Sequence, residues 1–193
     1  MELLSLLISI EIAVLFLTLL SASYQDMMIR RVKNITWLPI VVFCAPVSAI
    51  NCILLYQTDS FLTSLYLISA FWFALLAYLA ARVGIFGGAD AIALILISVC
   101  VPVCPFAPVV TIPGLTQVFV FPVVVYFNAV ILSAAVPLYL LIRNNHLREK
   151  TPFMTRCTCV PFSSEDGSVM WKKYPVPFIV PITIGFVLAL IGI

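Results

Sequence analysis

The sequence predicts an all-α membrane protein that crosses the bilayer about six times. Of its 193 residues, 64% are hydrophobic and only 9% are charged, whereas a soluble domain is roughly 25% charged. The mean hydropathy is +1.21. The apolar residues are gathered in runs of about 17–25 residues, which is the length that a helix needs to cross the hydrocarbon core. The basic residues, in contrast, are confined to alternate connections between these runs.

The six apolar runs are 3–23, 36–56, 61–81, 88–104, 117–142 and 175–192. Between them lie a basic segment (24–35), a short link (57–60), a Gly-rich turn (82–87), an uncharged Pro-rich segment (105–116) and a polar segment (143–174). A cleaved signal peptide is not expected, because Met1-Glu2 provides no basic region before a run long enough to span. We expect residues 1–193 to form a single integral membrane domain that contains 143–174 as a polar loop.

The distribution of basic residues predicts the orientation in the membrane. All of them follow the first, third or fifth apolar run: Arg30, Arg31, Lys33, Arg82, Arg143, Arg148, Lys150, Arg156, Lys172 and Lys173. Cytoplasmic loops carry an excess of Lys and Arg. We therefore expect a multi-pass protein of the cell membrane, with both termini outside the cytoplasm and one longer cytoplasmic loop between the fifth and sixth helices.

Two aspartates are expected at similar depth on the cytoplasmic side. Asp26 follows the first run, and Asp90 opens the fourth run after Gly84-Ile85-Phe86-Gly87-Gly88-Ala89. An acid at the edge of a membrane segment is costly, which indicates a function. Glycines permit close backbone approach and positive φ, as a tight turn or a substrate groove requires. The alternative interpretation is a short loop with an Asp that caps the next helix.

Two neighbouring carboxylates can hydrolyse a peptide bond. Like charges at close range share one proton. The ionised group can take a proton from water, while the neutral group protonates the substrate carbonyl or the leaving nitrogen, without a covalent intermediate. The helix dipole favours Asp90, at a helix start, as the base and Asp26, at a helix end, as the acid. The pair nevertheless titrates as a unit, so either assignment stays open.

The other polar residues in the apolar runs are expected to be structural. Glu11 lies inside the first run and is expected to face a polar interior or to be protonated. Asn51 and Asn128 are expected to form interhelical hydrogen bonds. Pro46 is expected to interrupt the second helix, and kinks are expected where Pro122 and Pro137 lie, towards the two ends of the fifth helix.

No cofactor, metal or nucleic acid is expected. The cysteines of the apolar runs are interpreted as buried small hydrophobes; they are Cys44, Cys52, Cys100 and Cys104. Cys157 and Cys159 form a C-x-C that no second pair and no His cluster completes into a tetrahedral zinc site. His146 is the single histidine, so Ser/His and Cys/His catalysis have little support. There is no phosphate-binding loop or nucleotide fingerprint.

Three stretches resemble one protein family. Gly87-Gly88-Ala89-Asp90 resembles the GxGD motif of membrane aspartyl proteases, with Ala89 in place of the second Gly. The stretch from Asp26 to Asn34 resembles the segment that carries the other catalytic Asp in type IV prepilin peptidases. Residues 175–181 are similar to the last helix of archaeal preflagellin (archaellin) and prepilin peptidases. Bacterial members that also methylate the new N-terminus carry a paired C-x-x-C segment, which is absent here, so the resemblance implies a peptidase only.

The resemblance implies a membrane aspartyl endopeptidase that acts near the cytoplasmic face without a cofactor. Its partners would be the lipid bilayer and preflagellin- or prepilin-like precursors with class III signal peptides, whose short basic leader it would remove. Asp26 and Asp90 would be catalytic, and the supporting residues would be Gly87, Gly88, Ala89, Arg30 and Asn34. The alternatives are a small ion- or proton-coupled transporter with both aspartates along its pathway, which would predict inverted repeats, and a non-catalytic assembly factor.

Overall fold

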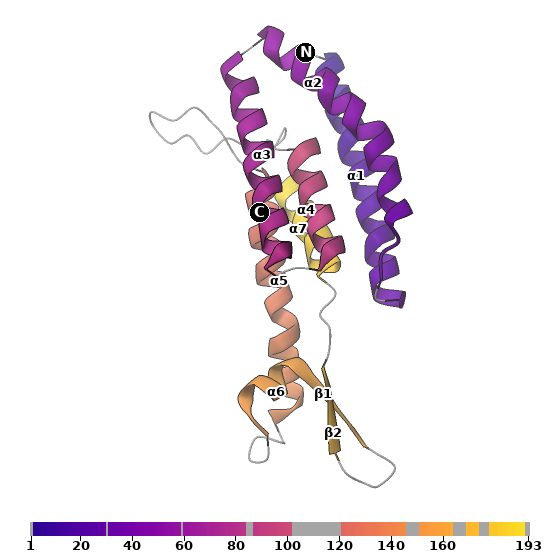
Figure 1. Cartoon of the computed structure of the whole chain (residues 1–193), viewed down its shortest axis with the longest axis vertical. Helices are drawn as coiled ribbons and strands as arrows, with labels where there is room; N and C mark the ends of the chain where they lie inside the picture. Colours follow the sequence, from indigo (N-terminus) through magenta and orange to yellow (C-terminus); the bar gives the residue numbers. More distant parts are fainter. Residues whose placement is uncertain are drawn as a thin grey trace. The chain divides into compact units, whose positions relative to one another are not determined.

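The computed structural model in Figure 1 describes residues 2–29, 31–58, 60–83, 87–101, 121–145, 151–163, 169–173 and 178–191. The chain divides into two compact units. The first comprises Met1–Ala129 with Pro177–Ile193, and the second comprises Val130–Val176. Each unit has its own architecture and is described by itself.

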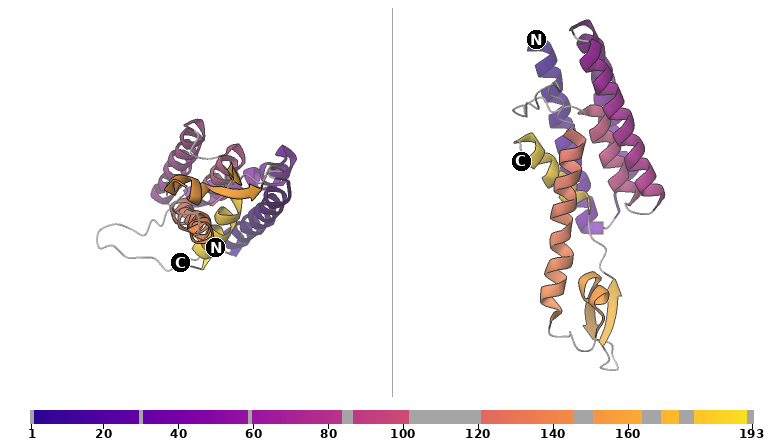
Figure 2. Two further views of the ribbon diagram at one scale, coloured as in Figure 1. Left: turned by 90° about the horizontal axis from the view of Figure 1, so that it is seen from below. Right: turned by 90° about the vertical axis from the view of Figure 1, so that its left-hand side faces the viewer.

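The first unit is a helical bundle (Figures 1 and 2). Its elements are α1 (Glu2–Ile29), the 3-10 turn η1 (Asn34–Trp37), the π-helical turn η2 (Ile40–Cys44), α2 (Ala45–Thr58), α3 (Ser60–Arg82), α4 (Gly88–Cys100), the first part of α5 (Phe121–Arg143) and α7 (Ile179–Leu190). Each of the six predicted apolar runs thus contains a helix.

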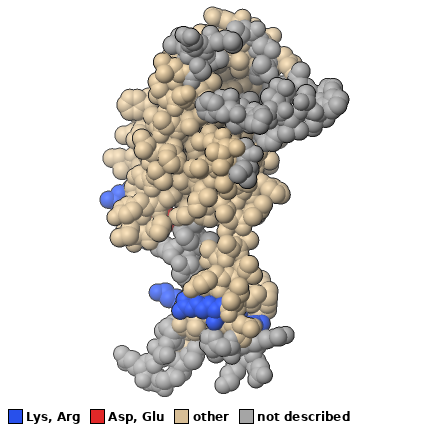
Figure 3. Space-filling model, turned by 180° about the vertical axis from the view of Figure 1, so that it is seen from behind, with Lys and Arg blue, Asp and Glu red and all other residues tan. Residues whose placement is uncertain are grey.

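Among the residues that the structure describes, three helical segments are long and apolar enough to cross a membrane: Leu6–Ile29, Asn34–Gln57 and Phe121–Arg143. Shorter apolar helices occur at Tyr66–Arg82, Gly88–Cys100 and Ile179–Leu190. The outward face of the bundle is also apolar, since Leu17, Phe43 and Phe71 are each more than half exposed, and wide areas of the surface in Figure 3 carry no charge. Exposed apolar surface of this extent is what a lipid-facing protein shows, as expected of a polytopic membrane protein.

The core of the first unit lies where α1, α4, α5 and α7 meet. Leu15 and Leu19 of α1, Ile97 of α4 and Phe186 of α7 are fully buried there. The ring of Phe186 packs edge to face against the ring of Phe121 in α5, with 5.4 Å between the two ring centroids. Next to it, a Cβ on Gly185 would lie 2.8 Å from the carbonyl oxygen of Val125 and 3.0 Å from the amide nitrogen of Ala129. Glycine therefore lets α7 pack directly on the backbone of α5, as small residues do between membrane helices.

Two helix boundaries differ from the sequence-based expectation. α1 continues to Ile29, beyond residue 23 where the first apolar run ends, so Asp26 lies in its last turn, at the helix end where it was expected; no Gly or Pro interrupts 24–29, and Met27 and Met28 favour helix. In the second run, η2 ends two residues before Pro46. Proline has no N–H to donate to the preceding turn, and π-helical turns accommodate such a break in the hydrogen-bond ladder. The expected interruption therefore lies just before Pro46.

The second unit contains a β-hairpin that the all-α prediction missed. The end of α5 is followed by α6 (Phe153–Thr158), β1 (Cys159–Ser163) and β2 (Val169–Lys173), and the two strands pair antiparallel with Pro161 opposite Trp171. Pro161 is tolerated because both strands of such a sheet are edge strands. The Asn144 side-chain amide donates to the carbonyl oxygens of Arg156 (2.9 Å) and Cys159 (3.0 Å), which ties α5 to α6 and β1.

Candidate functional site

Asp90 lies in the first turn of α4 and caps the start of that helix. The N–H of Gly87, the N-cap residue, donates to Asp90 Oδ2 at 3.0 Å. The first N–H groups of a helix have no partner within it, and a side chain that reaches back to them stabilises the turn. The capping role that the sequence suggested as the alternative is therefore present. It holds the half-buried carboxyl group of Asp90 against the Gly-rich turn.

Gly87 is needed for the close approach of the Asp90 carboxylate. A Cβ on Gly87 would lie 2.9 Å from Asp90 Oδ2, whereas a Cβ on Gly88 would meet no atom within 4 Å. The backbone of Gly87 has φ −66° and ψ 157°, which any residue can adopt. Close approach, and not positive φ, is thus the reason for glycine at position 87. Gly84, Ile85 and Phe86 lie outside the described residues.

Asp26 and Asp90 are brought together although they are far apart in the sequence. Asp26 is in the last turn of α1, which packs against α4. The carboxyl groups of the two residues interact electrostatically, and both side chains are half-buried. Like-charged carboxylates repel each other when both are ionised.

The end of α1 is held in place by hydrogen bonds of Ser23 and Gln25, which precede Asp26. Gln25 Oε1 accepts from the backbone N–H of Lys33 (3.1 Å), and the Gln25 amide pairs with the hydroxyl of Thr36 in η1 at 2.8 Å. The hydroxyls of Ser23 and Thr183, in α7, lie 2.7 Å apart. These contacts hold the last two turns of α1, which include Asp26. These contacts were not predicted from the sequence; the signal for them was the run of polar side chains near the end of an apolar helix.

The remaining predicted site residues are placed as follows. Ala89 is half-buried and packs against the core, and Gly88 is the exposed first residue of α4. Asn34 is exposed and begins η1, on the segment that Gln25 holds against α1. Arg30 lies outside the described residues. Within the described part of the chain, no three His, Cys, Asp or Glu side chains are arranged to hold a metal ion.

A second cluster of polar side chains, centred on Glu11, lies inside the bundle. The Glu11 side chain is 1% exposed. The Ser48 hydroxyl donates to Glu11 Oε1, and the Asn51 amide donates to Oε2 at 2.7 Å. The prediction that Asn51 bonds between helices is confirmed, because these contacts join α1 to α2. Asn51 Oδ1 is buried without a hydrogen-bond partner among the described residues.

The expectation that the cysteines of the apolar runs are buried is confirmed in part. Cys44 and Cys100 are buried, as predicted, and Cys52 is half-buried. Cys104 lies outside the described residues. In the second unit, Cys157 is buried and Cys159 is half-buried.

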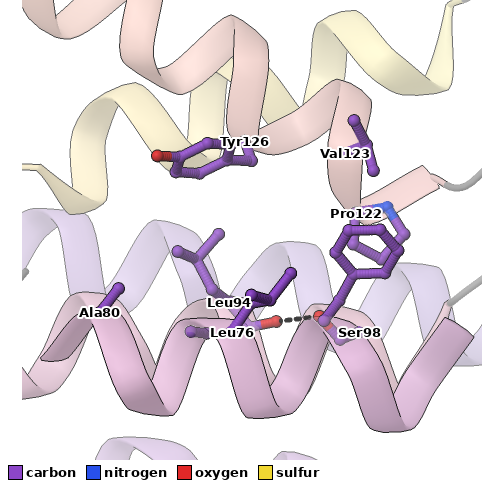
Figure 4. Close-up of a pocket in the computed structure, with 9 residues that line it drawn as sticks. Leu76, Ala80, Leu94, Ser98, Pro122, Val123 and Tyr126 are labelled. Atoms are coloured by element: carbon purple, nitrogen blue, oxygen red, sulfur yellow. Dashed lines mark hydrogen bonds between the residues drawn. The ribbon is translucent and has the colours of Figure 1, made fainter. Parts of the chain in front are cut away.

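An apolar cavity of about 330 Å³ lies between α3, α4 and the first part of α5 (Figure 4). Its walls include Ala77 and Ala80 of α3, Leu94 and Ser98 of α4, and Val123 and Tyr126 of α5. The Ser98 hydroxyl donates to the Leu94 carbonyl oxygen at 2.7 Å, so the polar group of Ser98 is already satisfied. The cavity therefore offers mainly hydrocarbon to a ligand.

Comparison with known proteins gives one relevant similarity. No protein-family model matches the chain. Over 139 residues, or 70% of the chain, the sequence is 32% identical to a protein named preflagellin peptidase from Methanococcus voltae. The matched region covers 58% of that protein, so the chain spans less than two thirds of the length of the relative.

Proposed function

We propose that the chain is a membrane aspartyl endopeptidase that removes the basic leader from preflagellin-like precursors. The electrostatic interaction between Asp26 and Asp90 is the observation that carries this proposal, because acid–base peptide hydrolysis uses two carboxyl groups that lie near each other. The similarity to a preflagellin peptidase supports the substrate class. The transporter alternative has no comparable support.

In the proposed reaction the two aspartates share one proton and hold a water molecule. The ionised carboxylate takes a proton from this water, whose oxygen attacks the carbonyl carbon of the scissile bond, while the neutral carboxyl group protonates the carbonyl oxygen. When the tetrahedral intermediate collapses, the C–N bond breaks and the nitrogen takes the proton that the base received from water. One hydroxyl of the intermediate then returns its proton to the other aspartate, which re-forms the C=O bond and restores the shared proton. The hydrogen bond from Gly87 to Asp90 would keep one carboxylate oriented during these steps.

The reaction would take place near the cytoplasmic face of the cell membrane. Arg31 and Lys33 follow α1 directly and are exposed, and cytoplasmic loops are rich in basic residues. A site at this depth is within reach of water and of a bond that immediately precedes a membrane helix. The leader of a class III signal peptide would then stay on the cytoplasmic side while the apolar segment of the precursor stays in the bilayer.

The test is cleavage of a preflagellin by the purified chain in liposomes. We expect a single shortened product that begins at the junction of leader and apolar segment, identified by mass spectrometry of its new N-terminus. The same liposomes report on the transporter alternative through ion or proton flux. Flux without any cleaved product would reject the peptidase assignment.

A matched pair of glycine substitutions tests the role of the turn. Gly87→Ala is expected to push Asp90 Oδ2 away, because the new Cβ would lie 2.9 Å from it, and to lower cleavage by about 10- to 100-fold, as misplacement of a reacting group does. A Cβ at Gly88 meets open space, so Gly88→Ala is expected to lower cleavage less than Gly87→Ala does. Both rates are measured on the same preflagellin. Equal rates for the two variants would mean that the Gly87 contact does not position Asp90.

A further inference from the structure

We propose that the apolar cavity between α3, α4 and the first part of α5 receives the first large apolar side chains that follow the scissile bond of the precursor. This assignment rests on the proposed peptidase function and adds a binding site to it. The cavity would recognise aliphatic or aromatic side chains at the start of the membrane segment of the substrate. Its position, its shape and its chemistry each support this assignment.

The position of the cavity is set by the face of α4 that carries Asp90. Asp90, Leu94 and Ser98 follow one another at intervals of four residues, so they lie on successive turns along one side of the helix. With a rise of 1.5 Å per residue, Leu94 is about 6 Å and Ser98 about 12 Å along the axis from Asp90. The cavity thus begins about one turn from Asp90 and extends away from it along α4.

The α3 wall leaves room because two of its side chains are small. α3 packs along α4 over much of its length. Ala80 comes two residues before Arg82, the last residue of α3, and Ala77 is about one turn earlier. Both line the cavity. Larger residues at these positions would fill the space, as cores normally are filled.

The size and chemistry of the cavity fit apolar side chains. A protein cavity of about 150 Å³ lined by aliphatic and aromatic residues can hold one benzene molecule, so a volume of about 330 Å³ has space for two large side chains. In Figure 4, Tyr126 and Val123 face Leu94 and Ala80 from the opposite wall. The hydroxyl of Ser98 is engaged by the Leu94 carbonyl oxygen and so adds little polarity.

The precursor segment is the occupant that the position favours. A bond held at Asp90 would place the residues after it alongside Leu94 and then Ser98, because these follow Asp90 on the same side of α4. A lipid acyl chain could also enter an apolar cavity, but it would have no relation to the scissile bond. The two occupants therefore predict different dependence on the sequence of the substrate.

The experiment measures the cleavage rate for each combination of enzyme variant and precursor variant. One precursor keeps two large apolar residues at the start of its membrane segment, and the other carries Ala at both places. The parent is expected to cleave the first faster by about tenfold or more, as apolar pockets discriminate side chains by size. Ala80→Phe fills the cavity and is expected to remove this preference, with the Ala precursor cleaved within about twofold of the parent rate. The control Ala81→Phe makes the same change at a neighbour that does not line the cavity and should keep the preference.

The outcomes separate this assignment from the peptidase proposal. If Ala80→Phe keeps the preference, or if it slows both precursors equally, the cavity does not bind the substrate. If the parent cleaves neither precursor, the peptidase function fails and the assignment fails with it. Should Ala80→Phe not accumulate in membranes, Asp90→Asn with a photoreactive first apolar residue in the precursor gives the answer. Cross-links to the cavity residues support the assignment, and cross-links to lipid alone overturn it.

Discussion

Asp26→Asn and Asp90→Asn are each expected to lower leader cleavage by about 10²- to 10⁴-fold, the usual contribution of general acid–base catalysis. Asn has nearly the same shape as Asp but cannot take up or release the proton. The two residues act on one water molecule, so the double variant should be hardly slower than either single variant. Rates are measured for the parent, the two single variants and the double variant on one precursor.

Asp59→Asn is the control for this set. It makes the same chemical change in the short segment between the second and third apolar runs, which the charge distribution places on the opposite side of the membrane. We expect cleavage within about twofold of the parent rate. Near-parental cleavage by Asp26→Asn or Asp90→Asn would show that the substituted aspartate is structural. Additive losses in the double variant would mean that the two groups act in separate steps.

The helical architecture could be predicted from hydropathy, but the ends of its helices could not. Hydropathy detects the part of a helix that is apolar, so the first run was expected to end at residue 23. The helix continues through Tyr24, Gln25 and Asp26 to Ile29, because its polar last turns are held by hydrogen bonds to η1 and α7. Those partners lie 11 and 160 positions away in the sequence, so the hydropathy of the first run does not reveal them.

The hairpin was missed for a different reason. The charges of 143–174 indicate on which side of a membrane the segment lies, and they carry no information about its local structure. Neither strand alternates apolar and polar residues along its length, and alternation is the pattern that indicates a half-buried strand. Pro161 also argues against a strand unless the strand is known to lie at an edge. Either strand could be predicted only if its pairing with the other strand were already known.

The candidate site was predictable in its acids but not in its surroundings. The depth argument pairs Asp26 with Asp90 from the order of the apolar runs alone. The contact between Gly87 and the Asp90 carboxylate depends on a side-chain rotamer, and the cavity depends on the volumes of side chains from three helices. Ala77, Ala80 and Leu94 are all simply apolar on a hydropathy scale. The shapes of the Gly87–Asp90 contact and of the cavity therefore could not be predicted from the sequence.

Glu11→Leu is expected to destabilise the bundle by about 1–3 kcal/mol, the cost of leaving a buried polar group without its partner. The Asn51 amide would lose its acceptor inside the bundle, and the Ser48 hydroxyl would lose one as well. Glu11→Gln is the matched variant. Its carbonyl oxygen can still accept a hydrogen bond, and its NH₂ group can donate to Asn51 Oδ1 if the Asn51 amide turns over. Stability is measured by thermal unfolding in detergent, together with the rate of leader cleavage.

We expect Glu11→Gln to unfold within about 0.5 kcal/mol of the parent, as a substitution that preserves its contacts does, and to cleave at the parental rate. Glu11→Leu should lose stability first and activity only as far as the bundle unfolds. A stable Glu11→Gln variant without cleavage would give the opposite conclusion, because the amide keeps the hydrogen bonds and removes only the exchangeable proton. Glu11 would then have to move a proton in the reaction, and the site would extend from Asp26 along α1 into the bundle.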